Sequence, residues 1–377
     1  MQSHKMELSE FKSALATRSL TRRQVHQALA AVGVMTVTVP ATMKPASAAA
    51  TIEVFSWQVY SPPELFGAYI EAFGEAPPFQ MFGENEESLL KVRAGYTPKI
   101  VQPASFMIGR FRDAGLLAPI DTGKLANYGD IFPQLKDIGG MSLDGVVYAV
   151  PAAWGYNSVL YRRDLAPEYI DDNTWEVLWD PTYAGRLAQW DSMDTVVLEA
   201  ALILGIEDPF HMNDDDLKTI RQKLVEQRPL LRFYWTSETD MEQAMAAGEI
   251  VAAVSWNSSF TSLRRNGIDV GYMTPREGTL TWVDTSILIK DGPGSEDEAL
   301  AFIDAFISAE SGKYLIEEYG FGSPNAKAYD LVDPETLRES GVDDPNRILS
   351  LGMFYGEFDP TVREKANVMF EEVKAGF

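Results

Sequence analysis

The sequence predicts an α/β protein built from two lobes. The chain that follows residue 48 is about 330 residues long, which is more than one hydrophobic core usually serves. Along this part, short apolar segments typical of strands alternate with segments whose apolar residues recur at helical spacing. This alternation is typical of mainly parallel sheets flanked by helices. We therefore expect one such sheet in each lobe.

The first 48 residues have the composition of an export signal. Arg22 and Arg23 precede an uncharged apolar stretch over residues 28–40, and a small-x-small sequence ends at Ala48. A charged leader, an apolar run too short to span a bilayer and such a cleavage site form a secretory signal peptide, and the paired arginines indicate the twin-arginine route. The alternative is an amphipathic helix of a cytosolic domain, which the lack of charge disfavours. We expect cleavage after Ala48 and a protein that works outside the cytoplasm.

Removal of the leader would leave a strongly acidic chain. The leader holds six of the 32 Lys and Arg residues and two of the 55 Asp and Glu residues, so 26 basic and 53 acidic residues remain and the net charge becomes −27. Such a chain repels nucleic acid and anionic lipid and attracts cations. No later segment is long and apolar enough for a membrane span. We expect no nucleic-acid partner and no direct membrane insertion.

Several kinds of chemistry are disfavoured by what the sequence lacks. There is no cysteine, hence no disulfide, thiol nucleophile or thiolate metal site. His211 is the only histidine after the leader, which nearly excludes histidine-based zinc sites and a Ser-His-Asp triad. The pair Gly320 and Gly322 leads into Ser323-Pro324 and is no phosphate-binding loop. We expect no metal, no cofactor and no enzymatic activity.

Four strand and helix pairs can be placed along the chain. Residues 52–55 predict a first strand, and Ser61-Pro62-Pro63-Glu64 has the spacing of a capping box with proline at the first helical position. The other strands are expected at 100–101, 187–188 and 250–254, followed by helices at 106–114, 196–204 and 260–265. In open α/β sheets, ligands bind beyond the carboxyl ends of the strands.

Aromatic side chains collect at these strand ends. Each one alone is more often a core residue, but their shared location predicts a ligand site. They are Trp57, Tyr60, Phe106, Trp190, Trp256 and Trp282. Asp191 directly follows Trp190, and Asp284 follows Trp282 after one residue. Carboxylates beside aromatic rings suit an organic cation, because the rings accept cation–π contacts and the carboxylates replace water around an ammonium group.

Residues 51–377 resemble the spermidine/putrescine-binding proteins, the periplasmic receptors of polyamine ABC importers. The resemblance rests on ordered motifs that extend over nearly the whole chain after the leader. These are Phe55–Pro63, Pro151–Gly155, Trp175–Gly185, Val254–Ser258, Trp282–Asp284 and Gly320–Asn325.

The resemblance implies a two-lobed periplasmic-binding-protein fold of type II with the ligand in the interlobe cleft. Residues 51–156 plus 283–330 would form lobe 1, and residues 157–282 plus 331–377 would form lobe 2. A hinge is then expected around the strands near Gly155-Tyr156 and Val283-Asp284. The implied partners are a polyamine-like organic cation and the permease subunits of an ABC transporter.

The resemblance also implies a role for particular side chains. Trp57 and Tyr60 would pack against the ligand from one lobe, and Trp256 and Trp282 would form walls around its methylene groups. The ammonium groups would be bound by Asp191, Asp194 and Asp284. The remaining implied contacts are Gln58, Ala104, Phe106 and Phe321.

This chain departs from the family pattern at one end of the expected slot. Val59 stands where the family usually has an acid, and Phe106 and Phe321 replace residues that often bear a hydroxyl. A shorter diamine, a guanidino compound or a methylated amine would suit a slot with fewer acids. A replacement carboxylate could come from Glu84, Glu86 or Glu87, whose alternative role is that of a solvated loop and helix start.

Three alternative interpretations remain open. Asp191 and Asp194 could cap and charge the start of the following helix. The same two acids could serve a hydrolase, although neighbours on one turn poorly meet the need for two acids on opposite sides of a bond. The same fold could also bind a metal ion or another small solute, although the scarcity of histidine disfavours iron.

Overall fold

The computed structural model describes residues 51–136, 138 and 140–376. The expected leader, with its paired arginines and its cleavage site, lies outside the described residues. The described residues form one compact unit. Within the described residues, no helix is long and apolar enough to cross a membrane.

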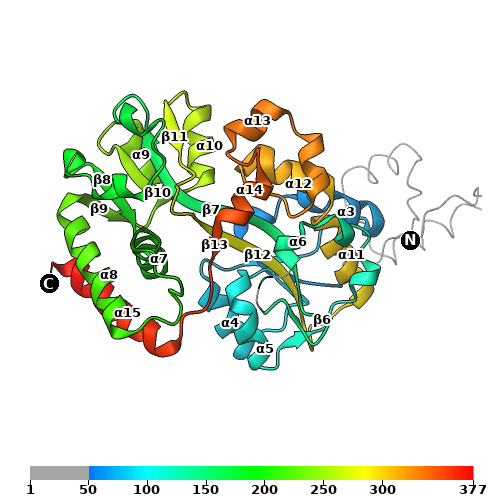
Figure 1. Ribbon diagram of the computed structural model, residues 1–377. Helices are drawn as coiled ribbons and strands as arrows, with labels where there is room; N and C mark the ends of the chain where they lie inside the picture. The colour runs from blue at the N-terminus through cyan, green and yellow to red at the C-terminus, as the bar shows by residue number, and fades with distance from the viewer. Residues whose placement is uncertain (1–50, 137, 139, 377) are drawn as a thin grey trace, which may run out of the picture. The chain divides into compact units, whose positions relative to one another are not determined.

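A single mixed sheet of eleven strands runs through this unit (Figure 1). Its main path has the order β2-β1-β3-β12-β7-β10-β8-β9. These strands are β1 (Val54–Ser56), β2 (Phe79–Met81), β3 (Ile100–Val101), β7 (Ala149–Arg162), β8 (Leu187–Trp190), β9 (Leu231–Trp235), β10 (Ala252–Trp256) and β12 (Thr279–Ile289). The four strands expected from the sequence are confirmed as β1, β3, β8 and β10.

The sheet is parallel at its two ends and antiparallel in its centre. β1 pairs in parallel with β2 and β3, and β8 pairs in parallel with β10 and β9. The long strands β7 and β12 pair antiparallel with each other and join these two parallel groups. The expected parallel sheets are therefore present as two groups linked by crossing strands.

Shorter strands complete the sheet. β11 (Val270–Tyr272) pairs with β7, while β4 (Leu117–Ala118) and β13 (Gly352–Phe354) pair with β12. A separate hairpin is formed by β5 (Ser142–Leu143) and β6 (Val146–Val147).

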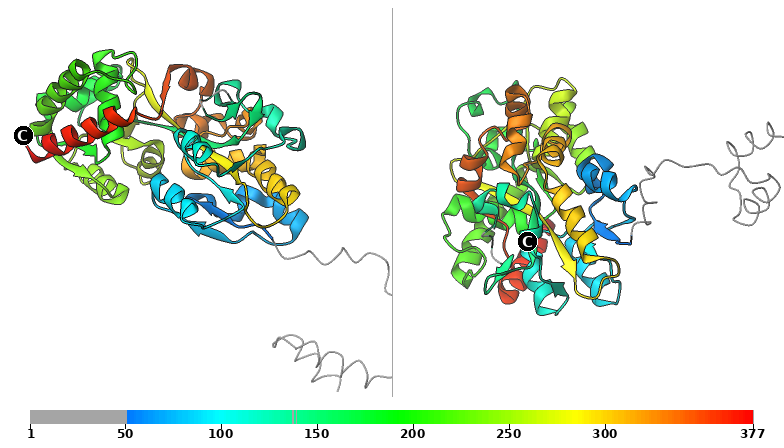
Figure 2. Two further views of the ribbon diagram at one scale, coloured as in Figure 1. Left: turned by 90° about the horizontal axis from the view of Figure 1, so that it is seen from below. Right: turned by 90° about the vertical axis from the view of Figure 1, so that its right-hand side faces the viewer.

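Helices flank both parallel groups. Around β1 to β3 they include α3 (Gly67–Phe73), α4 (Asn85–Arg93), α5 (Ile108–Asp113), α6 (Pro133–Lys136), α11 (Glu296–Phe306) and α12 (Ala309–Tyr314). Around β8 to β10 they are α7 (Met193–Leu204), α8 (Asp214–Gln227), α9 (Glu238–Ala246), α10 (Asn257–Arg265) and α15 (Pro360–Ala375). The remaining helices are α13 (Pro334–Glu339) and α14 (Pro345–Leu351). Figures 1 and 2 place α3 and the C-terminal end of α15 at opposite ends of the described part.

The apolar core is divided in the same way as the sheet. One large cluster of buried side chains takes its members from residues 52–156 and 283–349. A second large cluster and a smaller one take theirs from residues 159–280 and 355–373. The division supports a two-lobed architecture. The lobe boundaries stay a prediction, and buried residues between 332 and 349 pack with the first cluster although the sequence assigned them to lobe 2.

The helical segment expected after Ser61 does not begin as the sequence predicted. The expected capping box at Ser61 is absent, because the Ser61 hydroxyl donates to the carbonyl of Gln58 and the following 3-10 turn begins at Pro63 without a side-chain cap. A proline does occupy the first helical position, but it is Pro63, one residue later than a cap at Ser61 implies. By contrast, α7 is capped by Ser192, whose side chain accepts from the amide of Thr195. Neither Asp191 nor Asp194 is therefore the N-cap residue.

Candidate ligand-binding site

Asp284 lies at the centre of the candidate site. The hydroxyl of Tyr60, in the turn directly after β1, donates a 2.7 Å hydrogen bond to Oδ2 of Asp284 in β12. Ala104 forms an isolated bridge with Asp284, and the amide of Ala104 donates to Oδ1 of Asn85 at the start of α4. The segments that follow β1 and β3 thus meet the crossing strand at Asp284, and the start of α4, which follows β2, is bonded to the second of them.

The environment of Asp284 shifts its proton equilibrium. Burial raises the pKa of Asp284 to about 7, and the nearby side chains of Tyr60 and Trp57 oppose this rise. The indole N–H of Trp57 faces the carboxylate without meeting the geometry of a hydrogen bond. Among the described residues, no Lys, Arg or His forms an ion pair with Asp284. A cation bound here would supply the missing positive partner.

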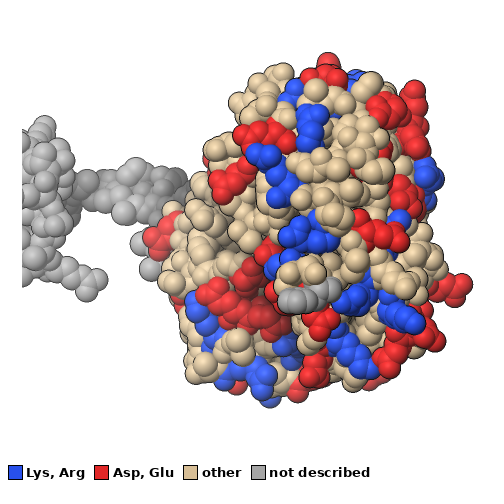
Figure 3. Space-filling model, turned by 90° about the vertical axis from the view of Figure 1, so that its left-hand side faces the viewer, with Lys and Arg blue, Asp and Glu red and all other residues tan. Residues whose placement is uncertain are grey.

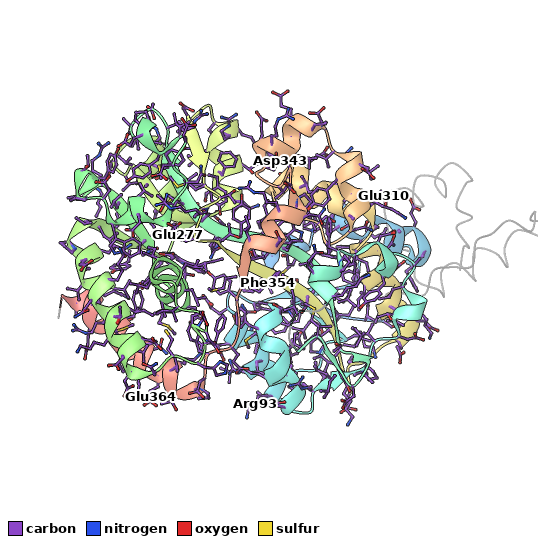
Figure 4. The ribbon with its side chains drawn as sticks, in the orientation of Figure 1. Arg93, Glu277, Glu310, Asp343, Phe354 and Glu364 are labelled. Atoms are coloured by element: carbon purple, nitrogen blue, oxygen red, sulfur yellow. The ribbon has the colours of Figure 1, made fainter. Side chains whose placement is uncertain are left out.

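Trp282 lies on the same strand, two residues before Asp284. Its ring packs on the backbone of Gly155 so closely that a Cβ at that position would lie 2.3 Å from Cζ2 of Trp282. The ring of Phe321 meets it edge-on at a centroid distance of 4.9 Å. Phe354, labelled in Figure 4, belongs to β13 and is paired with Thr281, next to Trp282. The side chain of Trp282 is half-buried, whereas its N–H group is buried and has no acceptor among the described residues.

Trp57 forms the other half-buried indole near Asp284. Its ring packs against Phe82 at 4.5 Å. Gln58 and Val59 in the same turn are exposed, so the position where the family usually has an acid faces solvent in this chain. The sequence-predicted residues Trp57, Tyr60 and Asp284 are thus brought together.

Trp256 belongs to a different aromatic cluster. Trp190 stacks on Trp235 at 5.8 Å, and Trp256 meets both rings edge-on at 5.2 and 5.6 Å. Among the described residues, no ring contact joins this cluster to Trp57 or Trp282. Sequence reasoning missed Trp235, although its place at the end of an apolar segment was the same signal that identified Trp190.

The carboxylate of Asp191 is already paired within the chain. Nζ of Lys374, near the end of α15, lies 2.6 Å from Oδ1 of Asp191. The same ammonium group lies 3.2 Å from Glu371 and 4.9 Å from the ring centroid of Phe370.

Asp194 is paired in the same way from the other end of α15. The guanidinium of Arg363 donates to both carboxylate oxygens of Asp194, at 3.2 and 3.1 Å. Burial raises the pKa of Asp194, while Arg363 opposes the rise and Glu86 adds to it. The influence of Glu86 shows that the start of α4 lies near Asp194.

Most of the acids at the start of α4 also have partners. Glu86 accepts two bonds from Arg110 of α5, and Nε of Arg110 lies 3.9 Å from Glu357. Glu87 pairs with Lys91 at 2.6 Å. Glu84 has no ion-pair partner among the described residues, and its pKa is raised by burial and by Glu87.

Phe106 lies between the two large core clusters. It packs partly against both and approaches Tyr355 with a centroid distance of 6.5 Å. The Tyr355 hydroxyl is within hydrogen-bonding distance of Thr195 and accepts from Asn157. No group of three or more His, Asp or Glu side chains in the described part of the chain is arranged to hold a metal ion.

The chain belongs to the bacterial extracellular solute-binding protein family, which matches residues 84–341. It is 25% identical over 294 residues to the spermidine/putrescine-binding periplasmic protein of Escherichia coli strain K12, covering 77% of this chain and 82% of the relative. It is 22% identical over 342 residues to the putrescine-binding periplasmic protein PotF of the same organism, covering 86% and 92%. These relatives are periplasmic binding proteins, which indicates an extracytoplasmic location for the family.

Solved structures show the same fold. The spermidine/putrescine ABC transporter substrate-binding protein PotD of Streptococcus pneumoniae superposes with a TM-score of 0.75 at 22% identity, covering 86% of this chain and 98% of that chain. The fold is therefore the type II periplasmic-binding-protein fold that the sequence predicted.

Proposed function

We propose that this protein captures a polyamine or a related organic cation in the periplasm and delivers it to the permease subunits of an ABC importer. The observation that carries the proposal is Asp284, a half-buried carboxylate without a cationic partner among the described residues, with Trp57 beside it and Trp282 two residues before it on the same strand. A carboxylate and aromatic faces together suit an ammonium or guanidinium group. The names of the relatives support the same ligand class.

The acidic surface fits a cationic ligand. The chain has a formal net charge of −23, and Figure 3 shows one contiguous group of acidic side chains, and others interspersed with Lys and Arg, on the face it displays. Such a field attracts cations and raises the rate at which they reach the protein.

Binding would be coupled to a hinge motion. β7 and β12 are the strands that join the two parallel groups, and they pair at Gly155 and Trp282. A ligand that contacts both groups stabilises the arrangement in which both contacts are made.

A role as a receptor is favoured over a role as a hydrolase. Asp191 and Asp194, the only carboxylate pair that suggested acid and base catalysis, are each held by a cation of α15. The relatives are transport proteins that bind a substrate. We propose that the ligand is bound and released without chemical change.

A thermal-shift screen tests the proposal. Polyamines, guanidino compounds, quaternary amines and amino acids are added separately, and a ligand that binds only the folded protein raises the melting temperature by mass action. We expect at least one organic cation to raise it. Mass spectrometry of the recovered ligand should show it unchanged. The absence of a shift with every cation, or conversion of the ligand, would overturn the proposal.

A further inference from the structure

Helix α15 brings two cations to two of the three carboxylates that the sequence assigned to ligand ammonium groups. Lys374 pairs with Asp191, and Arg363 pairs with Asp194 through two hydrogen bonds. The pairs join residues that are 183 and 169 positions apart in the chain. Each carboxylate thus has a positive partner that belongs to the protein itself.

These pairs are partly shielded from water. The side chains of Lys374 and Asp191 are 22% and 26% exposed, and those of Arg363 and Asp194 are 34% and 23% exposed. Lys374 also lies over the ring of Phe370, and Arg363 lies over that of Phe358 at 5.4 Å. Partly buried pairs are screened less by salt than exposed ones, and removing one partner leaves the other charge uncompensated.

A ligand ammonium group gains little from a carboxylate that is already neutralised. Its attraction to Asp191 is offset by repulsion from Lys374 at almost the same place. A ligand ammonium group that displaced Lys374 would break the existing charge-assisted hydrogen bond and form only a similar one in its place. The pairs Asp191–Lys374 and Asp194–Arg363 therefore present a nearly neutral surface to a cation.

Asp284 differs from both of these acids. It accepts a hydrogen bond from a neutral hydroxyl, that of Tyr60, and has no ion-pair partner among the described residues. Glu86 and Glu87 are also paired, with Arg110 and Lys91.

We propose that Lys374 and Arg363 determine the charge of the ligand. By neutralising Asp191 and Asp194 they leave Asp284 as the half-buried acid of the candidate site without an ion-pair partner among the described residues; Glu84 also has none, but it is exposed, where water and salt screen its charge. The ligand class is then an organic cation with a single charged group, such as an amino alcohol or a quaternary amine. This inference rests on the function proposed above. It narrows the ligand class from polyamines and related organic cations to organic cations with a single charged group.

Calorimetry with three amines of related carbon skeleton tests the inference. The probes are 4-aminobutan-1-ol with one ammonium group, putrescine with two and spermidine with three. We expect the wild-type protein to bind the amino alcohol within about threefold of putrescine, because the second ammonium group of putrescine finds no free carboxylate.

Removing the positive charge of Lys374 or Arg363 should give the protein a preference for ligands with two ammonium groups. Lys374→Met keeps an unbranched side chain over Phe370 and frees Asp191. We expect it to raise the affinity for putrescine relative to the amino alcohol by about tenfold, the effect of one charge-assisted hydrogen bond. Arg363→Met should act in the same direction through Asp194.

Two further variants serve as controls. Lys365→Met breaks an ion pair of the same helix, between Lys365 and Asp214 at 2.5 Å, and should leave the ratio of affinities unchanged. The double variant Lys374→Met with Asp191→Asn should return to the wild-type ratio, because the freed carboxylate is removed again.

The outcomes separate this inference from the proposed function. If the wild type binds putrescine or spermidine more than about tenfold tighter than the amino alcohol, the charge assignment is wrong although the receptor still binds amines. The same holds if Lys374→Met is folded and leaves the ratio unchanged. If the variant does not fold, the wild-type ratio alone decides. Failure of every amine to bind would instead overturn the proposed function.

Discussion

The hydroxyl of Tyr60 and the carboxylate of Asp284 are joined by a 2.7 Å hydrogen bond across 224 positions of the sequence. The bond connects the turn after the first strand to one of the two long strands at the centre of the sheet. The tyrosine hydroxyl and the carboxylate are both shielded from water, so each needs a hydrogen-bond partner within the protein, and this bond supplies it. The hydrogen bond also fixes the orientation of the carboxylate that we propose as the cation-binding group.

Replacing Asp284 by Asn should weaken binding of the cognate cation by about 1.5–3 kcal/mol, the usual contribution of a hydrogen bond to a charged group. The change preserves the shape of the side chain and removes its charge, and calorimetry measures the result. Asp269→Asn is a matched control, because Asp269 pairs only with Arg163 at the surface, at 3.7 Å. Equal affinities of wild type and Asp284→Asn would remove Asp284 from the site.

Binding should depend on pH around neutrality. The pKa of Asp284 is about 7 in the folded protein, and an amine ligand keeps its charge in this range. Below the folded pKa the carboxyl is protonated, so affinity should fall by up to about tenfold per pH unit as the pH decreases, and should level off above it. A series of titrations between about pH 5 and pH 9 checks this. A flat profile would show that the bound cation does not interact with Asp284.

The stability of the ligand-free protein should change in the opposite direction. Because the pKa of Asp284 is raised above its unfolded value of about 3.9, the folded state holds the proton more tightly, and stability falls as the pH rises from about 4 to about 7. Asp284→Asn should therefore raise the melting temperature of the ligand-free protein above neutral pH. Thermal unfolding of both proteins at about pH 5 and pH 8 would show the difference, and a lower melting temperature for the variant at the higher pH would contradict it.

Replacing Tyr60 by Phe should shift the pH profile without abolishing binding. The hydroxyl of Tyr60 opposes the rise in the pKa of Asp284, so its removal should raise that pKa further and weaken binding most near neutral pH. Above the new pKa the affinity should largely recover. Tyr169→Phe offers a matched control, because its hydroxyl donates to Asp180 at 2.9 Å in the other core cluster. An equal loss of affinity at every pH would indicate a structural role for Tyr60.

Gly155→Ala should displace the ring of Trp282. The added methyl group would lie 2.3 Å from Cζ2 of Trp282, and overpacking of this kind costs about 1–3 kcal/mol. We expect lower thermal stability together with weaker ligand binding. Gly129→Ala is the control, since no atom lies within 4 Å of the corresponding position. Unchanged binding in Gly155→Ala would show that the position of Trp282 does not matter for the ligand.

A separate prediction concerns the leader. Changing both Arg22 and Arg23 to Lys keeps the charge but should block the twin-arginine route, so that the precursor accumulates in the cytoplasm. The measurement is the amount of protein in the periplasmic fraction. Normal export of the double variant would mean that residues 28–40 are recognised by the general secretory route.

Local patterns predicted much of the fold and part of the site. β1, β3, β8 and β10 were identified because their apolar segments are short and bounded. The fold class followed from the ordered motifs and is confirmed by the comparison with solved structures. Trp57, Tyr60 and Asp284, three of the residues expected to contact the ligand, lie close together, and their contact with a ligand stays a prediction.

The remaining features depend on contacts that no local pattern encodes. The pairing of Asp191 with Lys374 depends on how α15 packs against α7 and α8, because the two residues are 183 positions apart. The cap at Ser61 was wrongly expected because its hydroxyl bonds back to Gln58, a local competition that Ser side chains often resolve in this way. Trp256 was placed by position at a strand end, but its ring packs with Trp190 and Trp235.

The position of Asp284 within β12 has a consequence for how such receptors diverge. The ladder with β7 shifts register between Asp284 and Thr285, and β12 is bonded to β3 on its other side. Inserting or deleting one residue of β12 before Trp282 would turn Trp282 and Asp284 together to the other face of the sheet, because side chains alternate along a strand. Receptors of this architecture that acquire new ligands should therefore keep the length of β12 constant and change its residues one at a time.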